Sequence, residues 1–196
     1  MNATSVTWQR RELLLALLGS GLALSCRKAP PTLGDVGTFS LTDQAGRTVT
    51  AESLRGKVWA AAFMFTRCPT VCPRITRRMR DLQQAAGQKH VALELVSFSV
   101  DPEFDTPAVL TEYAKQHGAD LASWRFLTGD LEVVRKTSEQ GFKLALDGKA
   151  TAGAEHFGLF HGSHLVLVDA QGQIRGYYRT SEDEQMARLL ADAASL

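Results

Sequence analysis

The stretch VWAAAFMFTRCPTVCPRI, residues 58–75, joins a long apolar run to two of the three cysteines in the chain. Residues 58–66 carry no charge, and such a continuous apolar run predicts a strand buried in the middle of a sheet. Cys68 and Cys72 follow, and a proline comes directly after each of them. The stretch therefore predicts a central strand, then a turn that holds both cysteines, and then a helix.

The segments on both sides of this stretch predict alternating strands and helices. A β-hairpin is expected at 37–50 and a second one at 164–178, and residues 143–160 have no clear period and form an insertion before the second hairpin. The other expected elements are a helical turn at 51–57, strands at 91–101 and 124–129, and helices at 73–87, 106–118, 131–142 and 181–196, the last capped by Ser181. This order predicts an α/β chain with the thioredoxin-like fold.

The first 34 residues indicate export and attachment to a membrane. Arg10 and Arg11 precede an apolar run at 13–25, which is typical of a signal peptide and short for a bilayer span. The run ends in LALSC at 22–26, a lipobox-like sequence in which Cys26 would be lipidated; an uncleaved signal anchor or cleavage after Ala23 or Ser25 are alternatives. We expect a targeting or anchor segment at 1–26, a tether at 27–34 and one thioredoxin-like domain at 35–196, facing the periplasm or another extracytoplasmic space.

The composition of the chain excludes some classes of binding partner. The net charge of +1 over 196 residues argues against nucleic acid, because binding to phosphates requires a surplus of basic residues. No apolar stretch of about 18 residues follows residue 26, so no internal membrane span is expected. In an oxidising envelope, and with Cys26 lipidated, Cys68 and Cys72 remain as the only pair of thiols.

Pro73 predicts where the helix after the cysteines begins. A proline inside a helix lacks the N–H that the carbonyl four residues earlier would accept, whereas the first helical position tolerates it well. The helix is therefore expected to begin at Pro73, with Cys72 at its N-terminus, where backbone N–H groups favour a thiolate, and with Arg67 and Arg74 adding positive charge. One turn of chain brings residues four apart to the same side, so both sulfurs can meet one ligand or each other.

Two kinds of chemistry suit this pair of thiols. Thiolates select soft metals, and Cu(I) accepts few ligands, so it is the best metal candidate; zinc would require additional ligands. The same spacing also permits a structural or redox-active disulfide between Cys68 and Cys72. The spacing alone leaves the metal site and the disulfide open.

A histidine can supply a third ligand. His161 and His164 lie at the entry of the second hairpin, in the loop that faces the cysteine turn in thioredoxin-like folds. Thioredoxin oxidoreductases carry a cis-proline in that loop, and this chain has no proline after Pro107. The other three histidines are weaker candidates, one in the insertion and two expected on the solvated surface: His156, His90 and His117.

Three motifs together resemble the SCO/SenC family of copper-binding assembly proteins. They are FTRCPTVCP (65–73), SFSVDPEFDTP (97–107) and FHGSHLVLVDAQGQIRGYY (160–178), and the resemblance extends over about residues 33–195. It implies a thioredoxin-like domain anchored to a membrane, with copper, as Cu(I) or Cu(II), bound by both motif cysteines and one histidine. Carried over to this chain, the ligands are Cys68, Cys72 and His161, with His164 as the alternative to His161. Asp101 belongs to the second motif, and we expect no ligand role for it.

The resemblance also implies a function. The family serves the assembly of the dinuclear copper site of cytochrome c oxidase, as a metallochaperone, as a thiol reductant for the cysteines of that site, or as both. The expected partner is the copper-bearing subunit of the oxidase or another copper protein, and the chain is expected to bind and deliver more than to turn over a substrate. The alternative is an envelope thiol–disulfide oxidoreductase or thiol peroxidase, with Thr66 and Arg67 beside an activated cysteine.

Overall fold

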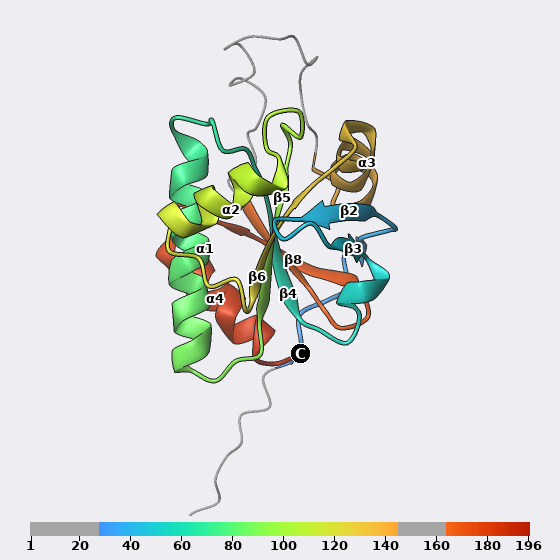
Figure 1. Cartoon of the computed structure of the whole chain (residues 1–196). Helices are drawn as coiled ribbons and strands as arrows, with labels where there is room; N and C mark the ends of the chain where they lie inside the picture. The colour runs from blue at the N-terminus through green and yellow to red at the C-terminus, as the bar shows by residue number, and fades with distance from the viewer. Residues whose placement is uncertain (1–27, 145–163) are drawn as a thin grey trace, which may run out of the picture.

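The computed structural model describes residues 28–144 and 164–196, which form an eight-stranded sheet with helices on both faces (Figure 1). This is the α/β arrangement predicted from the sequence. The elements follow one another in chain order: β1 Gly34–Asp35, β2 Ser40–Asp43, β3 Thr48–Thr50, η1 Glu52–Leu54, β4 Trp59–Met64, α1 Val71–Gln88, β5 Glu94–Ser99, α2 Pro107–Gln116, β6 Trp124–Thr128, α3 Leu131–Lys136, η2 Thr137–Gly141, β7 His164–Val168, β8 Gln173–Arg179 and α4 Asp183–Ala193.

The strands lie in the order β1-β8-β7-β4-β5-β6-β2-β3, with β4 near the centre. β4 runs parallel to β5, and β5 runs parallel to β6, whereas β7 is antiparallel to β4 and β8 is antiparallel to β7. This topology confirms the thioredoxin-like fold, with the expected hairpin of β7 and β8 beside β4. The N-terminal hairpin of β2 and β3 is also confirmed, and it extends the sheet by pairing with β6.

β4 is buried along its whole length, as its continuous apolar sequence predicts. Successive side chains of a strand point to opposite faces, so its odd-numbered and even-numbered residues enter two different core clusters. On one face, the ring of Phe63 stacks on Phe98 at 4.9 Å between centroids and meets Phe142 edge to face at 5.3 Å. The strand that leads to the cysteines is therefore held rigidly from both sides.

Helices cover the two faces unequally. The long helices α1, α2 and α4 pack on one face, and α3, η2 and η1 lie on the other (Figure 1). α2 begins as predicted, with Pro107 in the first helical position and the Thr106 hydroxyl accepting a hydrogen bond from the Val109 N–H at 3.4 Å. The cap expected at Ser181 is wrong, because Glu182 is the last residue with extended backbone before α4.

The two ends of the sheet differ in which strands and helices begin or finish there. β4, β5, β6 and β8 all finish at one end, which we call the site end, and α1, α2 and α4 begin there because each follows one of these strands. At the other end, the basal end, the helices finish, and Figure 1 shows the C-terminus there, close to where the described chain begins at Lys28. Helix N-termini carry partial positive charge, so the site end favours anions such as thiolates.

Candidate functional site

The cysteine turn connects β4 to α1 at the site end. The Cys68 N–H donates to the Phe65 carbonyl at 3.3 Å, and α1 then begins at Val71, two residues before the expected start at Pro73. The expected start is wrong because the first four N–H groups of a helix have no partner within it, so Pro73 loses no hydrogen bond in the third helical position. The carbonyl four residues earlier, that of Pro69, lies outside the helix.

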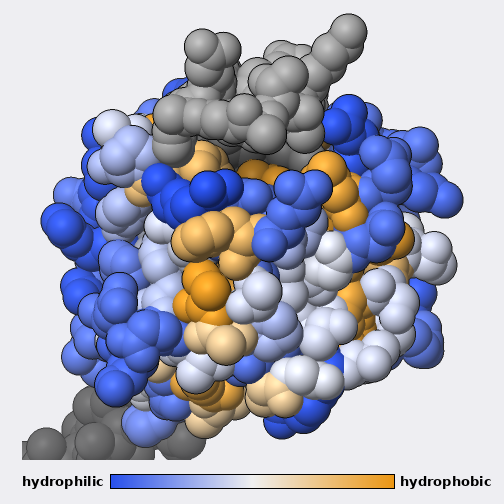
Figure 2. All heavy atoms as spheres, turned by 45° about the horizontal axis from the view of Figure 1, so that its top comes forward, coloured by the Kyte–Doolittle hydropathy of each residue, from blue (hydrophilic) through white to orange (hydrophobic). Residues whose placement is uncertain are grey.

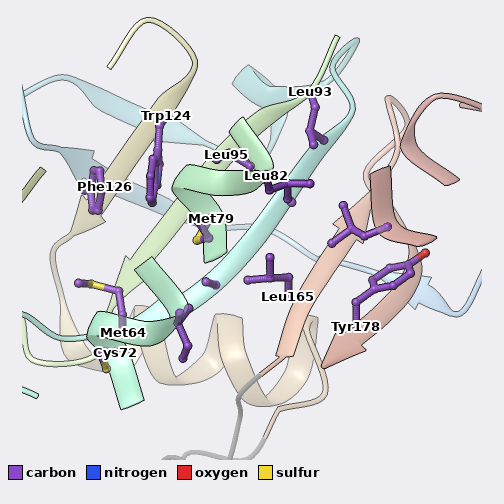
Figure 3. Packing of buried hydrophobic residues seen from close by; sticks show 14 of the residues in the cluster. Met64, Cys72, Met79, Leu82, Leu93, Leu95, Trp124, Phe126, Leu165 and Tyr178 are labelled. Atoms are coloured by element: carbon purple, nitrogen blue, oxygen red, sulfur yellow. The ribbon is translucent and has the colours of Figure 1, made fainter. Parts of the chain in front are cut away.

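The two cysteines lie together at the start of α1. The backbone N–H of Cys72 donates to the Cys68 sulfur at 3.4 Å, and the two thiols also share a hydrogen bond. Both are free thiols and both are buried, with 8% of Cys68 and 1% of Cys72 exposed. Figure 3 shows Cys72 among the side chains of the core cluster between α1 and the sheet. The sequence prediction that one turn brings the two sulfurs together is consistent with this geometry.

Cys68, and not Cys72, is the thiol that the helix start activates. Burial by itself would raise the pKa of Cys68, but the backbone N–H groups of Cys72, Thr70 and Val71 point at its sulfur and bring the pKa below the ordinary 9.0. The expectation that Cys72 is the favoured thiolate is therefore wrong. N–H groups at the start of the helix do favour a thiolate, as expected. The sulfur that they face is that of Cys68, three residues before α1 begins at Val71.

Cys72 is held in the protonated form. Burial is the main cause, and the neighbouring Cys68 and the negative charge of Asp105 add to it, which together raise the pKa of Cys72 to about 12. The pair is thus asymmetric, with one thiol prepared to act as a nucleophile or first metal ligand and the other as a protonated reserve.

This asymmetry predicts very different rates of alkylation. At about pH 8, a thiol of pKa near 12 is expected to react about 40-fold more slowly than one of pKa near 9, since its smaller thiolate fraction outweighs its higher intrinsic nucleophilicity. Cys68 should react faster still. A limiting amount of iodoacetamide added to the reduced protein, followed by peptide mass spectrometry, measures the ratio, and equal labelling of the two cysteines would contradict the assignment.

Asp105 is a buried carboxylate beside this turn that the sequence analysis did not single out. No part of it is exposed to solvent, and it accepts hydrogen bonds from the Thr66 N–H at 3.1 Å, from the Thr66 hydroxyl, and from the Ser99 hydroxyl at 2.6 Å. Thr66 lies two residues before Cys68, so Asp105 ties the cysteine turn to the loop after β5. The only signal in the sequence was its place in the motif DPEFDTP.

The buried carboxylate predicts a dependence of stability on pH. Burial raises the pKa of Asp105 above the ordinary 3.8, although the hydrogen bonds from Ser99 and Thr66 oppose the shift. A raised pKa in the folded state means that the acid stabilises the fold fully below pH 3.8 and that this contribution is lost as the pH rises through the folded-state pKa. Denaturant unfolding at several pH values should show the wild type losing stability relative to Asp105→Asn as pH increases, and a difference that does not change with pH would contradict this account.

The exposed side of the turn carries a second link to the same loop. Arg67 forms an ion pair with Asp101 at 2.6 Å, and its guanidinium lies 4.2 Å from the centre of the Phe104 ring. Arg67 therefore does not face the thiols as a free charge, which was the expectation from sequence. Phe104 is 42% exposed, and Figure 2, which brings the site end forward, shows apolar patches between charged surface on this side.

The described histidines do not complete a site with the cysteines. In the part of the chain that the structure describes, no three side chains of His, Cys, Asp or Glu gather closely enough to hold a metal ion. His164, the alternative ligand, is half-buried at the start of β7, and burial, assisted by Arg179, lowers its pKa. His90 is exposed as expected, whereas His117 is half-buried against the ring of Tyr113.

The remaining predicted residues lie outside the described ranges. His161 and His156 fall between residues 144 and 164, and Cys26 precedes residue 28. The described topology is informative, because β7 is antiparallel to β4, so the chain enters β7 at His164 at the same end of the sheet where β4 leaves toward the cysteines. No helix within residues 28–144 or 164–196 is long and apolar enough to cross a bilayer.

Comparison with known proteins identifies the family. The model of the family described as SCO1/SenC matches residues 29–195, nearly the whole described part of the chain. The chain belongs to the SCO1/SenC family. The resemblance seen in the three sequence motifs is thereby confirmed, and so is the family's fold.

Three solved structures of the SCO1/SenC family are similar to this chain. The crystal structure of a SCO1/SenC family lipoprotein from Bacillus anthracis is 34% identical, with a TM-score of 0.76 and coverage of 85% of this chain and 97% of that one. BsSco, described with a disulfide switch and as a member of the Sco family of cytochrome c oxidase assembly proteins, is 32% identical, with a TM-score of 0.74 and coverage of 86% and 97%. Bradyrhizobium japonicum ScoI with copper bound is 29% identical, with a TM-score of 0.64 and coverage of 78% and 96%.

Proposed function

We propose that this chain is a copper metallochaperone of the cell envelope that carries one copper ion on Cys68, Cys72 and His161. The observation that carries the proposal is the cysteine turn, where two buried thiols share a hydrogen bond and helix amides lower the pKa of one of them. The copper bound in the similar ScoI structure and the description of BsSco as a cytochrome c oxidase assembly protein support it. The recipient we propose is the dinuclear copper site of that oxidase.

The donor set suits copper as cargo. Two thiolates and one imidazole match the preference of Cu(I) for soft ligands in low coordination number, and Cu(II) accepts the same groups with a further ligand such as water. Cys68 binds first, since its thiolate is the more populated. The arriving cation then favours loss of the proton from Cys72, because metal coordination deprotonates a thiol. Burial of the pair limits access of water to the bound ion.

The third ligand we propose is His161. The chain enters β7 at the end of the sheet that holds the cysteine turn, and His161 precedes the first residue of β7 by three positions. His164 does not gather with the two cysteines among the described residues, which favours His161 over the alternative.

The second candidate function is reduction of a partner's disulfide by the same two thiols. The difference between the pKa values of Cys68 and Cys72 favours it. The Cys68 thiolate would attack a disulfide of the partner and form a mixed disulfide, and Cys72 would then attack the Cys68 sulfur. The partner's disulfide becomes two thiols and the Cys68–Cys72 pair becomes a disulfide, so two electrons pass to the partner. The partner also receives the proton of Cys72 and one proton from solvent, which replaces the proton that Cys68 had already lost. BsSco is described with a disulfide switch, which supports this chemistry. Copper loading and the disulfide are mutually exclusive states of one turn.

Anaerobic titration with Cu(I) tests the proposal. The reduced protein should bind one equivalent tightly, and the oxidised protein, with its pair converted to a disulfide, should bind none at this site. If the reduced and the oxidised protein bind the same number of copper ions, the assignment of the site to the two cysteines is wrong. Absence of copper binding together with rapid consumption of peroxide would favour the thiol peroxidase that the sequence left as an alternative.

The anchoring part of the proposal concerns Cys26. We infer that Cys26 is lipidated and holds the domain to the outer side of the cytoplasmic membrane, on the basis of the lipobox-like sequence at 22–26 and the lipoprotein nature of the similar Bacillus anthracis protein. Mass spectrometry of the N-terminal peptide from the mature protein tests it, with Cys26→Ser as the variant that should lose both the lipid and the membrane association.

A further inference from the structure

A groove lies at the basal end, opposite the cysteine turn. It has a volume of about 960 Å³ and runs between the end of α1, the entry to β5 and the end of the chain after α4. Much of its lining is apolar, including Val91, Leu93, Ala193 and Leu196. The mechanism proposed for copper makes no use of this surface.

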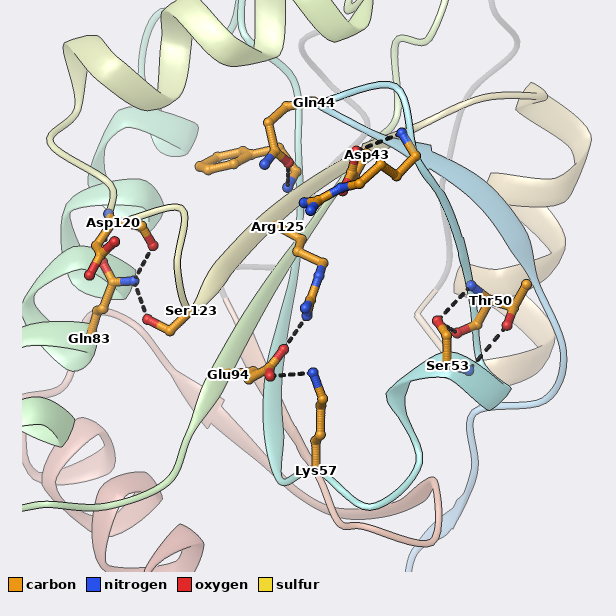
Figure 4. Close-up of polar contacts among 12 residues, drawn as sticks. Asp43, Gln44, Thr50, Ser53, Lys57, Gln83, Glu94, Asp120, Ser123 and Arg125 are labelled. Carbon is orange, nitrogen blue, oxygen red and sulfur yellow. Dashed lines mark hydrogen bonds and ion pairs between the residues drawn. The ribbon is translucent and has the colours of Figure 1, made fainter.

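Several polar groups on the rim of the groove are held by contacts within the protein. Lys57 forms an ion pair with Glu94 at 2.5 Å, and Arg125 pairs with the same carboxylate (Figure 4). The Gln83 amide donates to the Asp120 carbonyl at 2.8 Å and accepts from the Asp120 N–H at 3.1 Å. The acidic Glu94 therefore presents no free negative charge to whatever lies against the groove.

Exposed apolar and basic side chains gather at the same end. Of the four large hydrophobic residues that are clearly exposed in the described chain, Leu33, Leu121 and Leu196 belong to segments at the basal end, and only Phe104 lies at the site end. One exposed lysine, Lys89, stands on the rim of the groove where α1 ends, next to the exposed His90. This mixture of apolar, polar and cationic groups suits the interface of a bilayer, where acyl chains and phosphates lie close together.

The start of the described chain is fixed to the basal end. The Arg175 side chain donates to the Pro30 carbonyl, to the Thr32 hydroxyl at 3.1 Å, and to Asp169 in the β7–β8 turn at 3.0 Å. Only three residues, 27–29, separate Cys26 from Pro30. Four steps of chain reach at most about 14 Å, so a lipid on Cys26 would hold this end close to the membrane.

We propose that the basal groove is the face on which the domain rests against the lipid bilayer, an inference that rests on the anchoring through Cys26 proposed above. The short tether brings this face to the membrane, and the apolar lining and Lys89 on the rim contact the lipid. The cysteine turn then points away from the membrane. α1 spans 18 residues from the site end to the basal end and is about 27 Å long, so the cysteine turn lies roughly one helix length away from the basal groove.

The orientation is tested with the full chain, lipidated in cells and placed in lipid nanodiscs that contain a gadolinium chelate on a fraction of the headgroups. Amide NMR signals of residues 89–93 and 194–196 should be lost by paramagnetic relaxation, and signals of residues 70–72 and 103–105 should be retained. Inserting 12 Gly and Ser residues between Lys28 and Ala29 should keep the chain on the membrane but restore the basal signals.

A matched pair of substitutions separates the groove from the tether. Ala92→Glu places a charge in the groove, and Ala108→Glu places the same charge on the exposed first turn of α2 at the site end. Ala92→Glu should reduce the paramagnetic relaxation of the basal signals without abolishing it, because the tether still holds this end near the membrane, and Ala108→Glu should leave the relaxation unchanged. If the amide signals at both ends of an anchored chain are broadened equally, the proposed orientation is wrong but the anchoring stands. If the chain does not associate with the nanodisc, the anchoring is wrong as well.

Discussion

Cys68→Ser is expected to lower the affinity for Cu(I) by about 10²–10³-fold, because each ligand of a four-ligand structural metal site contributes about 2.5–4 kcal/mol. Serine has nearly the same shape, but its hydroxyl does not ionise near neutral pH and is a hard donor that Cu(I) does not favour. Cys68 is also the thiol whose pKa is lowered, so its loss removes the ligand that binds first. Anaerobic competition with a Cu(I) chelator of known affinity measures the change.

Met64→Leu is the matched control for this substitution. Met64 is a buried sulfur-containing residue of the same core cluster, but it lies on β4 before the turn and has no proposed ligand role. Its replacement conserves volume and should leave the copper affinity within about threefold of the wild type, since such swaps perturb a core little. Equal losses in Cys68→Ser and Met64→Leu would mean that the effect comes from disturbed packing and not from a lost ligand.

His161→Ala is expected to have the second-largest effect, again about 10²–10³-fold on Cu(I) affinity, since it removes one of three ligands. His164→Ala is the matched control, because it deletes the same side chain three residues later, at the start of β7. The control should retain affinity near that of the wild type. A loss in His164→Ala with none in His161→Ala would reverse the ligand assignment while leaving the two cysteines in place.

Much of the fold could be predicted from the sequence, because local patterns determine it. The apolar run at 58–66 reports burial on both faces, and β4 indeed lies near the centre of the sheet. Thr106 and Pro107 mark the start of α2, because a threonine hydroxyl caps a free helix N–H and a proline suits the first helical position. β1 was not predicted, since two residues provide no periodicity and this strand depends on pairing with β8.

The details of the site depend on contacts that a linear pattern does not contain. Pro73 predicted a helix after the cysteines but not its first residue, because Val71 and Cys72 also adopt helical geometry. The N–H groups at the helix start therefore face the Cys68 sulfur and not that of Cys72. The role of Asp105 could not be predicted from the sequence, because it depends on a contact with Thr66, which lies 39 residues earlier in the chain. The proposed third ligand, His161, rests on family resemblance and on the position at which β7 begins.

X-ray absorption spectroscopy of the Cu(I)-loaded protein tests the central claim most directly, since it counts the atoms bound to the metal and distinguishes sulfur from nitrogen. We predict one copper per chain with two sulfur ligands and one imidazole nitrogen, and loss of the nitrogen signal in His161→Ala. Copper bound by nitrogen and oxygen alone, or by sulfurs shared between several coppers in a cluster, would contradict the claim that Cys68, Cys72 and His161 form one mononuclear site.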